Sequence, residues 1–243
     1  MIGEYAMQRG IKRRIKCTEP GNAPKVTLLS HKLAVDTPAF ALGPGMQVTP
    51  LKEISKGGSS NSYSISFSNH LGTHVDAPNH FDPKGRRISS YGPENFIFSR
   101  PILFDLPKEE SQLIRIEDLE QRAEVIEKAD ILLLRTGFQR YRRVDPKKYA
   151  TRNPGISASG AEYIARSFPR LRAIGVDTIS ISAVEHREEG REAHRNLLRD
   201  RDYFIIEDMD LAQYPKNVGR ILALPLFVEG IDSAPCTVIA ELA

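Results

Sequence analysis

The stretch ADILLLR at residues 129–135, followed by a helical pattern and a second apolar stretch, decides the fold. Its uninterrupted ILLL run is typical of a strand that is covered on both faces. At 159–168, Ser159 and Glu162 stand at capping-box spacing, which predicts a helix. The apolar AIGV at 173–176 predicts the next short, buried strand. Strands that alternate with helices indicate an α/β protein with a mixed or parallel sheet.

The regions on either side of this stretch extend the same pattern. Residues 115–126 carry the apolar spacing of a helix. Four further apolar stretches predict strands, at 26–29, 100–105, 203–206 and 221–224. No linker rich in proline or serine divides the middle of the chain, so we predict one domain over residues 25–243.

The N-terminal region is basic and accounts for part of the formal net charge of +3. Five cationic side chains crowd it: Arg9, Lys12, Arg13, Arg14 and Lys16. We predict a mobile basic lead-in over residues 1–24, because chain termini are usually loose. A basic arm can contact nucleic acid, but no aromatic side chains interleave with these cations, as base stacking would require, so a nucleic-acid partner is the weaker alternative.

The composition narrows the class and the location of the protein. Hydrophobic residues make up 40% and charged residues 27%, which is ordinary for a soluble globular protein. The two cysteines, Cys17 and Cys236, form no C-x-x-C pair, so reduced thiols are the simplest account. The N-terminus lacks a signal-peptide core, and the longest apolar runs are too short to span a bilayer. We therefore expect a cytoplasmic protein without a membrane partner.

Residues 62–68 show the clearest strand pattern in the sequence. Tyr63, Ile65 and Phe67 alternate with serines, which is the period of a half-buried strand. We expect its apolar face to pack inward and the strand to lead directly into His70.

A cluster of histidines follows this strand, in HLGTHVDAPNH at residues 70–80. Imidazole and carboxylate together suit zinc, manganese or iron(II), which makes His70, His74 and Asp76 candidate ligands. In a straight strand, residues four apart are separated by roughly 13 Å, which is too far to share one ion. We therefore predict a sharp bend at Gly72, where the missing Cβ permits unusual dihedral angles.

The same cluster supplies a candidate acid/base. An ion held by protein on part of its shell lowers the pKa of a bound water and supplies a hydroxide nucleophile. Asp76 has two oxygens and can bridge two ions. His80 lies beyond the Pro78 kink, where it can move protons at neutral pH without being a ligand.

Other candidate residues lie far along the chain, and the residues alone leave them undecided. His194 falls on a predicted helix at 191–198, and Glu207 closes an apolar strand, where a carboxylate needs a partner such as a metal. His186 competes with His194, but it sits in a charged run at 185–191 that we expect to be a solvated loop. His31 follows a strand, and we assign it no role.

The segment HLGTHVDAPNHF at residues 70–81 resembles the H-x-G-T-H-x-D-x-P-x-H-F signature of the cyclase family, which includes bacterial kynurenine formamidases and isatin hydrolases. The match is complete over the fixed positions. Weaker similarity runs along most of the chain from about residue 25, in the segments 29–31 with 36–38, 134–137, 175–178, 193–198 leading to 206–207, and 224–226 with 232–235.

The resemblance implies a metal site with named ligands. It implies His70, His74 and Asp76 as ligands of one ion. It implies Asp76, His194 and Glu207 as ligands of a second ion, with Glu207 shared between the two ions. It also implies His80 as proton donor and acceptor. It also implies the swivelling β/β/α fold in a single domain, one or two zinc or manganese ions, and a homodimer or higher homo-oligomer.

Two departures from the formamidases bear on the substrate. The formamidases carry a substrate-contacting Trp after the D-T-P segment, where this chain, which has no Trp, has Phe40. The spacing from His194 to Glu207 is one residue longer than the corresponding spacing in the formamidases. Both departures leave the hydrolase expectation intact, but N-formylkynurenine does not carry over as the substrate.

We therefore expect a metal-dependent, arylformamidase-like hydrolase that cleaves the C–N bond of a small amide or cyclic amide, with His80 as proton shuttle. One alternative is a lactone or other carbonyl hydrolase that uses the same site. The other is a non-catalytic metal-binding or small-molecule-binding protein. His80 discriminates, because a pure binder needs the ligands but no proton shuttle.

Overall fold

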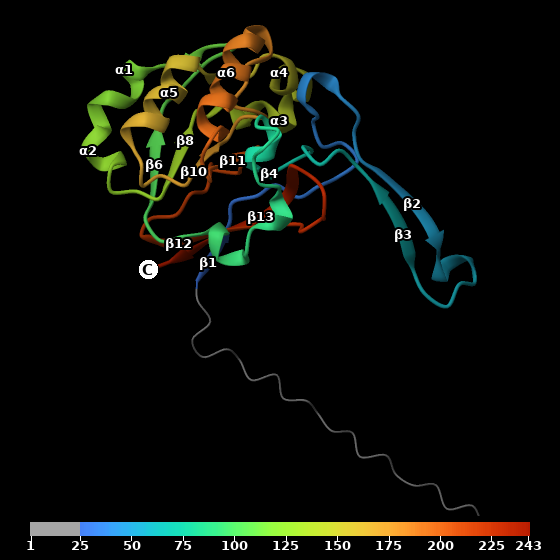
Figure 1. The fold of residues 1–243 in the computed structure, drawn as a ribbon. Helices are drawn as coiled ribbons and strands as arrows, with labels where there is room; N and C mark the ends of the chain where they lie inside the picture. The colour runs from blue at the N-terminus through green and yellow to red at the C-terminus, as the bar shows by residue number, and fades with distance from the viewer. Residues whose placement is uncertain (1–24) are drawn as a thin grey trace, which may run out of the picture.

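A nine-stranded mixed sheet is the centre of the computed structural model, which describes residues 25–243 (Figure 1). The predicted basic lead-in at 1–24 lies outside the described residues. In spatial order the strands are β5 (Ile97–Phe98), β12 (Val218–Pro225), β13 (Ser233–Leu242), β4 (His74–Asp76), β11 (Phe204–Glu207), β10 (Ala173–Val176), β8 (Ile131–Arg135) and β6 (Pro101–Asp105), and β1 (Val26–Leu28) pairs with β13.

At β4 the sheet changes from parallel to antiparallel pairing. β6, β8, β10 and β11 are parallel neighbours, whereas β4 pairs antiparallel with β11 on one side and with β13 on the other. Val75 lies opposite Ile206 and Ala234 in these two ladders. Side chains alternate between the faces of a strand, so His74 and Asp76 share the face opposite to that of Val75.

Helices cover one face of the parallel strands (Figure 1). The longest are α5 (Ala158–Ser167) and α6 (Arg187–Leu198), with the short α1 (Ile116–Leu119) and α2 (Ala123–Ile126) beside them. Alternate residues of the strands, such as Leu132, Ile174 and Ile205, form one core with apolar residues of the helices, such as Ile164 and Leu197.

The other face of the parallel strands packs on the antiparallel part of the sheet. Leu133 and Ile206 belong to a second core with Phe98, Ile221 and Val238. The continuous apolar run in β8 is thus buried on both faces, as such runs require. The resulting β/β/α layering confirms the predicted α/β class with a mixed sheet.

The remaining elements are short. They are α3 (Tyr141–Val144), α4 (Pro146–Thr151), β7 (Leu113–Ile114), β9 (Gly155–Ile156) and eight 3₁₀ turns within the described residues, of which Phe40–Leu42 and Pro78–His80 border the site. No helix among residues 25–243 is long and apolar enough to cross a bilayer.

The expectation that residues 62–68 pack inward is wrong. Among residues 25–243, β3 (Ser62–Ser66) pairs only with β2 (Gln47–Lys52), and the two form a hairpin that extends away from the rest of the described chain (Figure 1). Tyr63 is 51% exposed and Ile65 is 55% exposed. Alternation identifies a strand, but it does not show whether the same chain covers the apolar face.

Three helix predictions need smaller corrections. The helix predicted at 115–126 is interrupted, because Arg122 has non-helical dihedrals between α1 and α2. The N-cap of α5 is Ser157, whose side chain accepts a hydrogen bond from the Gly160 N–H, rather than Ser159. The charged run at 185–191 is not a loop, because α6 begins at Arg187.

Candidate metal centre

Gly72 supplies the bend that brings the first histidines together. Its φ is +72°, in the left-handed region, and a Cβ there would collide with the side chain of Leu33. The predicted bend is therefore confirmed. The Nδ1–H of His74 donates to the carbonyl oxygen of Gly72 at 2.8 Å, which leaves Nε2 facing the centre of the site.

A second glycine positions His194. The Nδ1–H of His194 donates to the carbonyl oxygen of Gly190, one turn earlier in α6, at 2.7 Å. A Cβ on Gly190 would collide with Ser182, so only glycine lets α6 approach the loop after β10 this closely. The free Nε2 of His194 lies 3.4 Å from Oε1 of Glu207.

Glu207 stands at the end of β11 and is buried. Its Oε1 accepts hydrogen bonds from the Ser180 hydroxyl at 2.9 Å and from the Ile181 N–H at 2.7 Å, and its Oε2 lies 3.4 Å from Nε2 of His74. Burial alone would raise the pKa of Glu207, but the imidazoles of His194 and His74, each 3.4 Å from one of its oxygens, lower it to about 2. Glu207 is therefore a carboxylate at neutral pH.

Asp76 is completely buried, and neither of its oxygens has a hydrogen-bond partner among the described residues. Oδ1 lies 3.0 Å from Nδ1 of His70 and 3.5 Å from Nε2 of His74. Burial opposes ionisation, but the positive fields of His80, His74 and His70 hold the pKa of Asp76 well below its usual value. In turn, burial lowers the pKa of His70, while Asp76 and Asp232 raise it to about 10.

These atoms fit a metal ion. The Nε2 of His74 and both oxygens of Asp76 are buried without partners, a costly state that a cation would relieve. The donors of His70, His74 and Asp76 lie within 4.8 Å of one another, as do those of Asp76, His80 and His194. Imidazole nitrogens and carboxylate oxygens are the donors that zinc and manganese accept.

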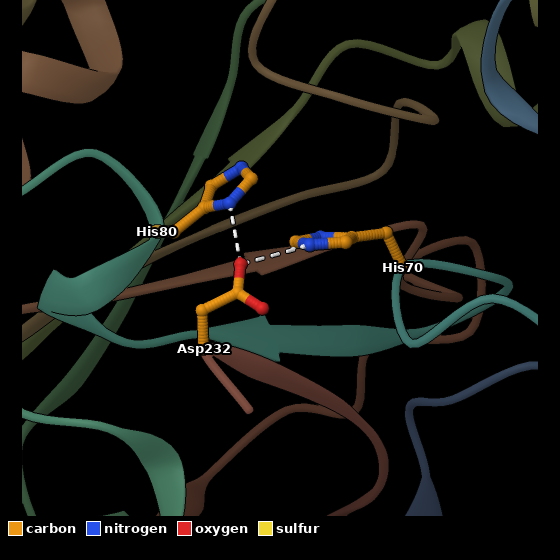
Figure 2. Close-up of side chains that lie close together, drawn as sticks. All are labelled: His70, His80 and Asp232. Carbon is orange, nitrogen blue, oxygen red and sulfur yellow. Dashed lines mark hydrogen bonds and ion pairs between the residues drawn. The ribbon is translucent and has the colours of Figure 1, made fainter. Parts of the chain in front are cut away.

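His80 and Asp232 form a pair at the edge of this group (Figure 2). The Nδ1–H of His80 donates to Oδ2 of Asp232 at 2.7 Å, and Nε2 of His70 lies 3.1 Å from the same oxygen. The side-chain N–H of Asn69 donates to Oδ1 of Asp232 at 2.9 Å. Burial raises the pKa of Asp232, but the hydrogen bonds from His70 and His80 hold it far below its usual value.

A cavity of about 290 Å³ opens above these residues and is called the central cavity below. Its apolar wall consists of Phe40, Phe81 and Ile179, and the Phe81 ring stacks on His194 with centroids 4.6 Å apart. The other lining residues are His70, His74, His80, Ser180, Ser182, Arg187, Arg191, His194 and Glu207. The volume is at the lower end of the range for small-molecule pockets.

The structure brings together the six residues that the sequence singled out as ligands or acid/base, and Phe40 lines the same cavity. They are His70, His74, Asp76, His80, His194 and Glu207. His186 lines a different hollow, beside Lys108. His31 lies behind the site, where its backbone N–H donates to the hydroxyl of Thr73.

Sequence reasoning missed Asp232 and the two arginines of the cavity. Asp232 begins one of the segments that resemble the family, which was the signal available, but no spacing relates it to His80. Arg187 and Arg191 belong to the charged run that we expected to be a solvated loop, and their position follows only from the start of α6.

Comparison with known proteins identifies the family. The sequence profile of the Cyclase family matches residues 27–183, which is more than half of the chain. The chain belongs to the Cyclase family.

Relatives of this family member include proteins from bacteria and plants. It is 27% identical to cyclase-like protein 1 of Arabidopsis thaliana over 229 residues, covering 87% of this chain and 82% of that protein. It is 28% identical to a kynurenine formamidase of Bacillus cereus over 187 residues, covering 73% of this chain and 78% of that protein. The fold is that of isatin hydrolase A from Ralstonia solanacearum, with a TM-score of 0.75, 23% identity, and coverage of 90% of this chain and 92% of that chain.

Proposed function

We propose that this protein is a metal-dependent hydrolase that cleaves the C–N bond of a small amide or cyclic amide. The ion would be zinc or manganese, one or two per chain, held by His70, His74, Asp76, His194 and Glu207. The observation that carries the proposal is the set of buried, unpartnered donor atoms on His74 and Asp76 beneath a cavity that also presents an oriented histidine.

The chemistry divides between the metal and the chain's own residues. A bound zinc or manganese ion supplies Lewis acidity and lowers the pKa of a coordinated water. His80 would take up and return the proton at Nε2, because Asp232 accepts the hydrogen bond from Nδ1–H and so fixes the tautomer. Phe40 and Phe81 would hold the apolar part of the substrate and keep bulk water away from the leaving nitrogen.

The kinship with a kynurenine formamidase supports hydrolysis of an amide bond. Because Phe40 stands where the formamidases have Trp, the proposal names the type of bond that is cleaved and does not name N-formylkynurenine as the substrate. A lactone hydrolase would use the same residues. A protein that only binds metal would have no use for the hydrogen-bonded pair of His80 and Asp232.

The test is a hydrolysis screen of the full chain loaded with zinc or manganese, against a formyl-anilide, a cyclic imide and a lactone. Elemental analysis of the same samples gives the metal content. We expect amide or imide turnover that chelation abolishes. His80→Ala should keep the metal and lose turnover, whereas His194→Ala should lose metal.

His186→Ala is the matched control, because His186 lies outside the central cavity, and it should keep both metal and activity. If His80→Ala lost its metal and His194→Ala kept it, the assigned roles would be wrong. If only the lactone were hydrolysed, the protein would be an ester hydrolase and the amide proposal would be wrong.

A further inference from the structure

Two arginines share a helix face with the proposed ligand His194. Arg187 and Arg191 precede His194 in α6 by seven and three residues, spacings that put all three on one side of the helix. At about 1.5 Å per residue, Arg191 lies about 4.5 Å and Arg187 roughly 10 Å from His194 along the helix axis. His194 is buried and both arginines are exposed, and all three line the central cavity. This face of α6 therefore leads from the metal centre to the cavity mouth.

The two arginines differ in their partners. Nη1 of Arg191 lies 2.5 Å from Oε1 of Glu188. The nearby Glu185 is paired with Arg152. Within residues 25–243, Arg187 is left without a carboxylate partner, although it lines the central cavity. A guanidinium in this position is available to a ligand.

The charge distribution of the central cavity explains what that ligand would be. The proposed divalent ion would offset the charge of Asp76 and Glu207 at the base of the cavity, so a carboxylate at the far end of a substrate would need a cation of its own elsewhere in the lining. Arg187 supplies this cation at the mouth, and as the first residue of α6 it lies where the helix dipole also favours an anion. The planar guanidinium binds a carboxylate through two parallel hydrogen bonds.

We propose that Arg187, assisted by Arg191, binds a carboxylate group of the substrate. This inference rests on the proposed function and adds to it the substrate class, which is a small amide whose apolar body lies against Phe40 and Phe81 and whose far end carries a carboxylate. The amide then lies at the metal centre and the carboxylate at the mouth.

The test compares 4-formamidobenzoate with its neutral isostere 4-formamidobenzamide, since both present the same formamide bond. The wild-type, metal-loaded full chain should show at least a tenfold higher kcat/KM for the carboxylate. Arg187→Gln should reduce this ratio to about one, mainly through KM, and Arg187→Lys should restore part of it. Arg195→Gln is the matched control, because Arg195 is on the same helix but lines a different hollow, and it should keep the wild-type ratio.

Calorimetric binding of the two compounds separates this inference from the proposed function. If neither compound is hydrolysed, tighter binding of the carboxylate that Arg187→Gln abolishes still supports a carboxylate site. Equal kcat/KM and equal binding for the two compounds in the wild type would overturn it. A carboxylate preference that survives in Arg187→Gln would overturn it as well, because the preference would then come from the metal centre.

Discussion

The Nδ1 atom of His80 lies 2.7 Å from Oδ2 of Asp232, although 152 residues separate the two in the sequence. The carboxylate accepts the Nδ1–H and so leaves Nε2 of His80 to exchange protons, the arrangement by which many enzymes orient a general base. In the proposed reaction Asp232 is therefore a positioning residue, which acts through His80.

Asp232→Asn should lower kcat by about 100-fold or more, because an amide no longer fixes the imidazole tautomer. Metal content, measured by elemental analysis, should stay at the wild-type level. The double variant with His80→Ala should be no slower than His80→Ala alone, because the two residues act as a unit. Loss of metal from Asp232→Asn would show instead that Asp232 acts through His70, whose Nε2 lies 3.1 Å away.

Removing the metal should destabilise the fold. Zinc at 100 times its dissociation constant would stabilise the native state by about 2.7 kcal/mol, because the unfolded chain does not hold the donors together. We expect the Tm to fall on chelation and to return with added zinc. Asp76→Asn should abolish this zinc-dependent increment, and His186→Gln should retain it. A Tm that zinc leaves unchanged in the wild type would contradict the site.

A buried ion pair lies directly behind the metal centre. Nη2 of Arg142 lies 2.7 Å from Oδ2 of Asp208, whose φ of +52° is unusual for a residue other than glycine. The Tyr149 hydroxyl also donates to this carboxylate, at 2.6 Å. Asp208 adjoins Glu207 in the chain, so the pair holds the backbone that presents a proposed ligand.

Arg142→Met should therefore cost about 3–5 kcal/mol in the free energy of unfolding, since it leaves a carboxylate buried without its partner. Denaturant titration measures this, and zinc affinity should fall as well. Arg140→Met, which removes the exposed ion pair with Glu109, is the control and should cost less than about 1 kcal/mol. Equal costs for the two variants would refute the role of the buried pair.

The stability of the protein should depend on pH through His31. Burial lowers the pKa of His31 below its usual 6.5, although Asp208 and Asp210 oppose the shift. The unfolded chain then binds more protons than the native state, so this contribution is complete above pH 6.5 and is lost as the pH falls below it. Between about pH 7 and pH 5, His31→Gln should lose less stability than the wild type in denaturant titrations. The exposed-site variant His186→Gln is the control, and identical slopes for His31→Gln and wild type would exclude the effect.

The hairpin of β2 and β3 provides a test of assembly. We propose that it packs against a second copy of the chain, because an isolated two-stranded hairpin is marginal in water and this one exposes Tyr63 and Ile65. Light scattering should give at least twice the mass of one chain for the wild type and a lower mass for Ile65→Lys. A wild-type monomer at micromolar concentration would contradict the proposal.

The residue patterns were sufficient for the α/β class and for four of the six central residues, whereas His194 and Glu207 were implied only by the resemblance to the family. The buried strands β8 and β10 are continuous apolar runs, and His70, His74, Asp76 and His80 lie in one short motif. β13 escaped notice, because Pro235 and the polar residues around it break the pattern of a strand, although it is among the longest in the sheet. Pairing over long sequence separations carries no local signal.

The lack of a local signal for long-range contacts also explains why the hairpin strand and Arg187 were misplaced. The alternation at 62–68 identified a strand correctly, but whether its apolar face is covered depends on elements elsewhere, and none of residues 25–243 covers it. Arg187 was assigned to solvent from its charged neighbours, whereas its position at the cavity depends on the helix that begins there.

The place of β4 in the sheet also constrains when this protein could acquire the proposed ion. β4 carries His74 and Asp76, but both of its neighbours, β11 and β13, come from the last fifth of the sequence. A ribosome therefore releases the ligand motif long before it makes the strands that hold it. On the proposed site, a chain truncated before residue 233 would lack β13 and should fail to retain the ion, even though it contains the whole histidine motif.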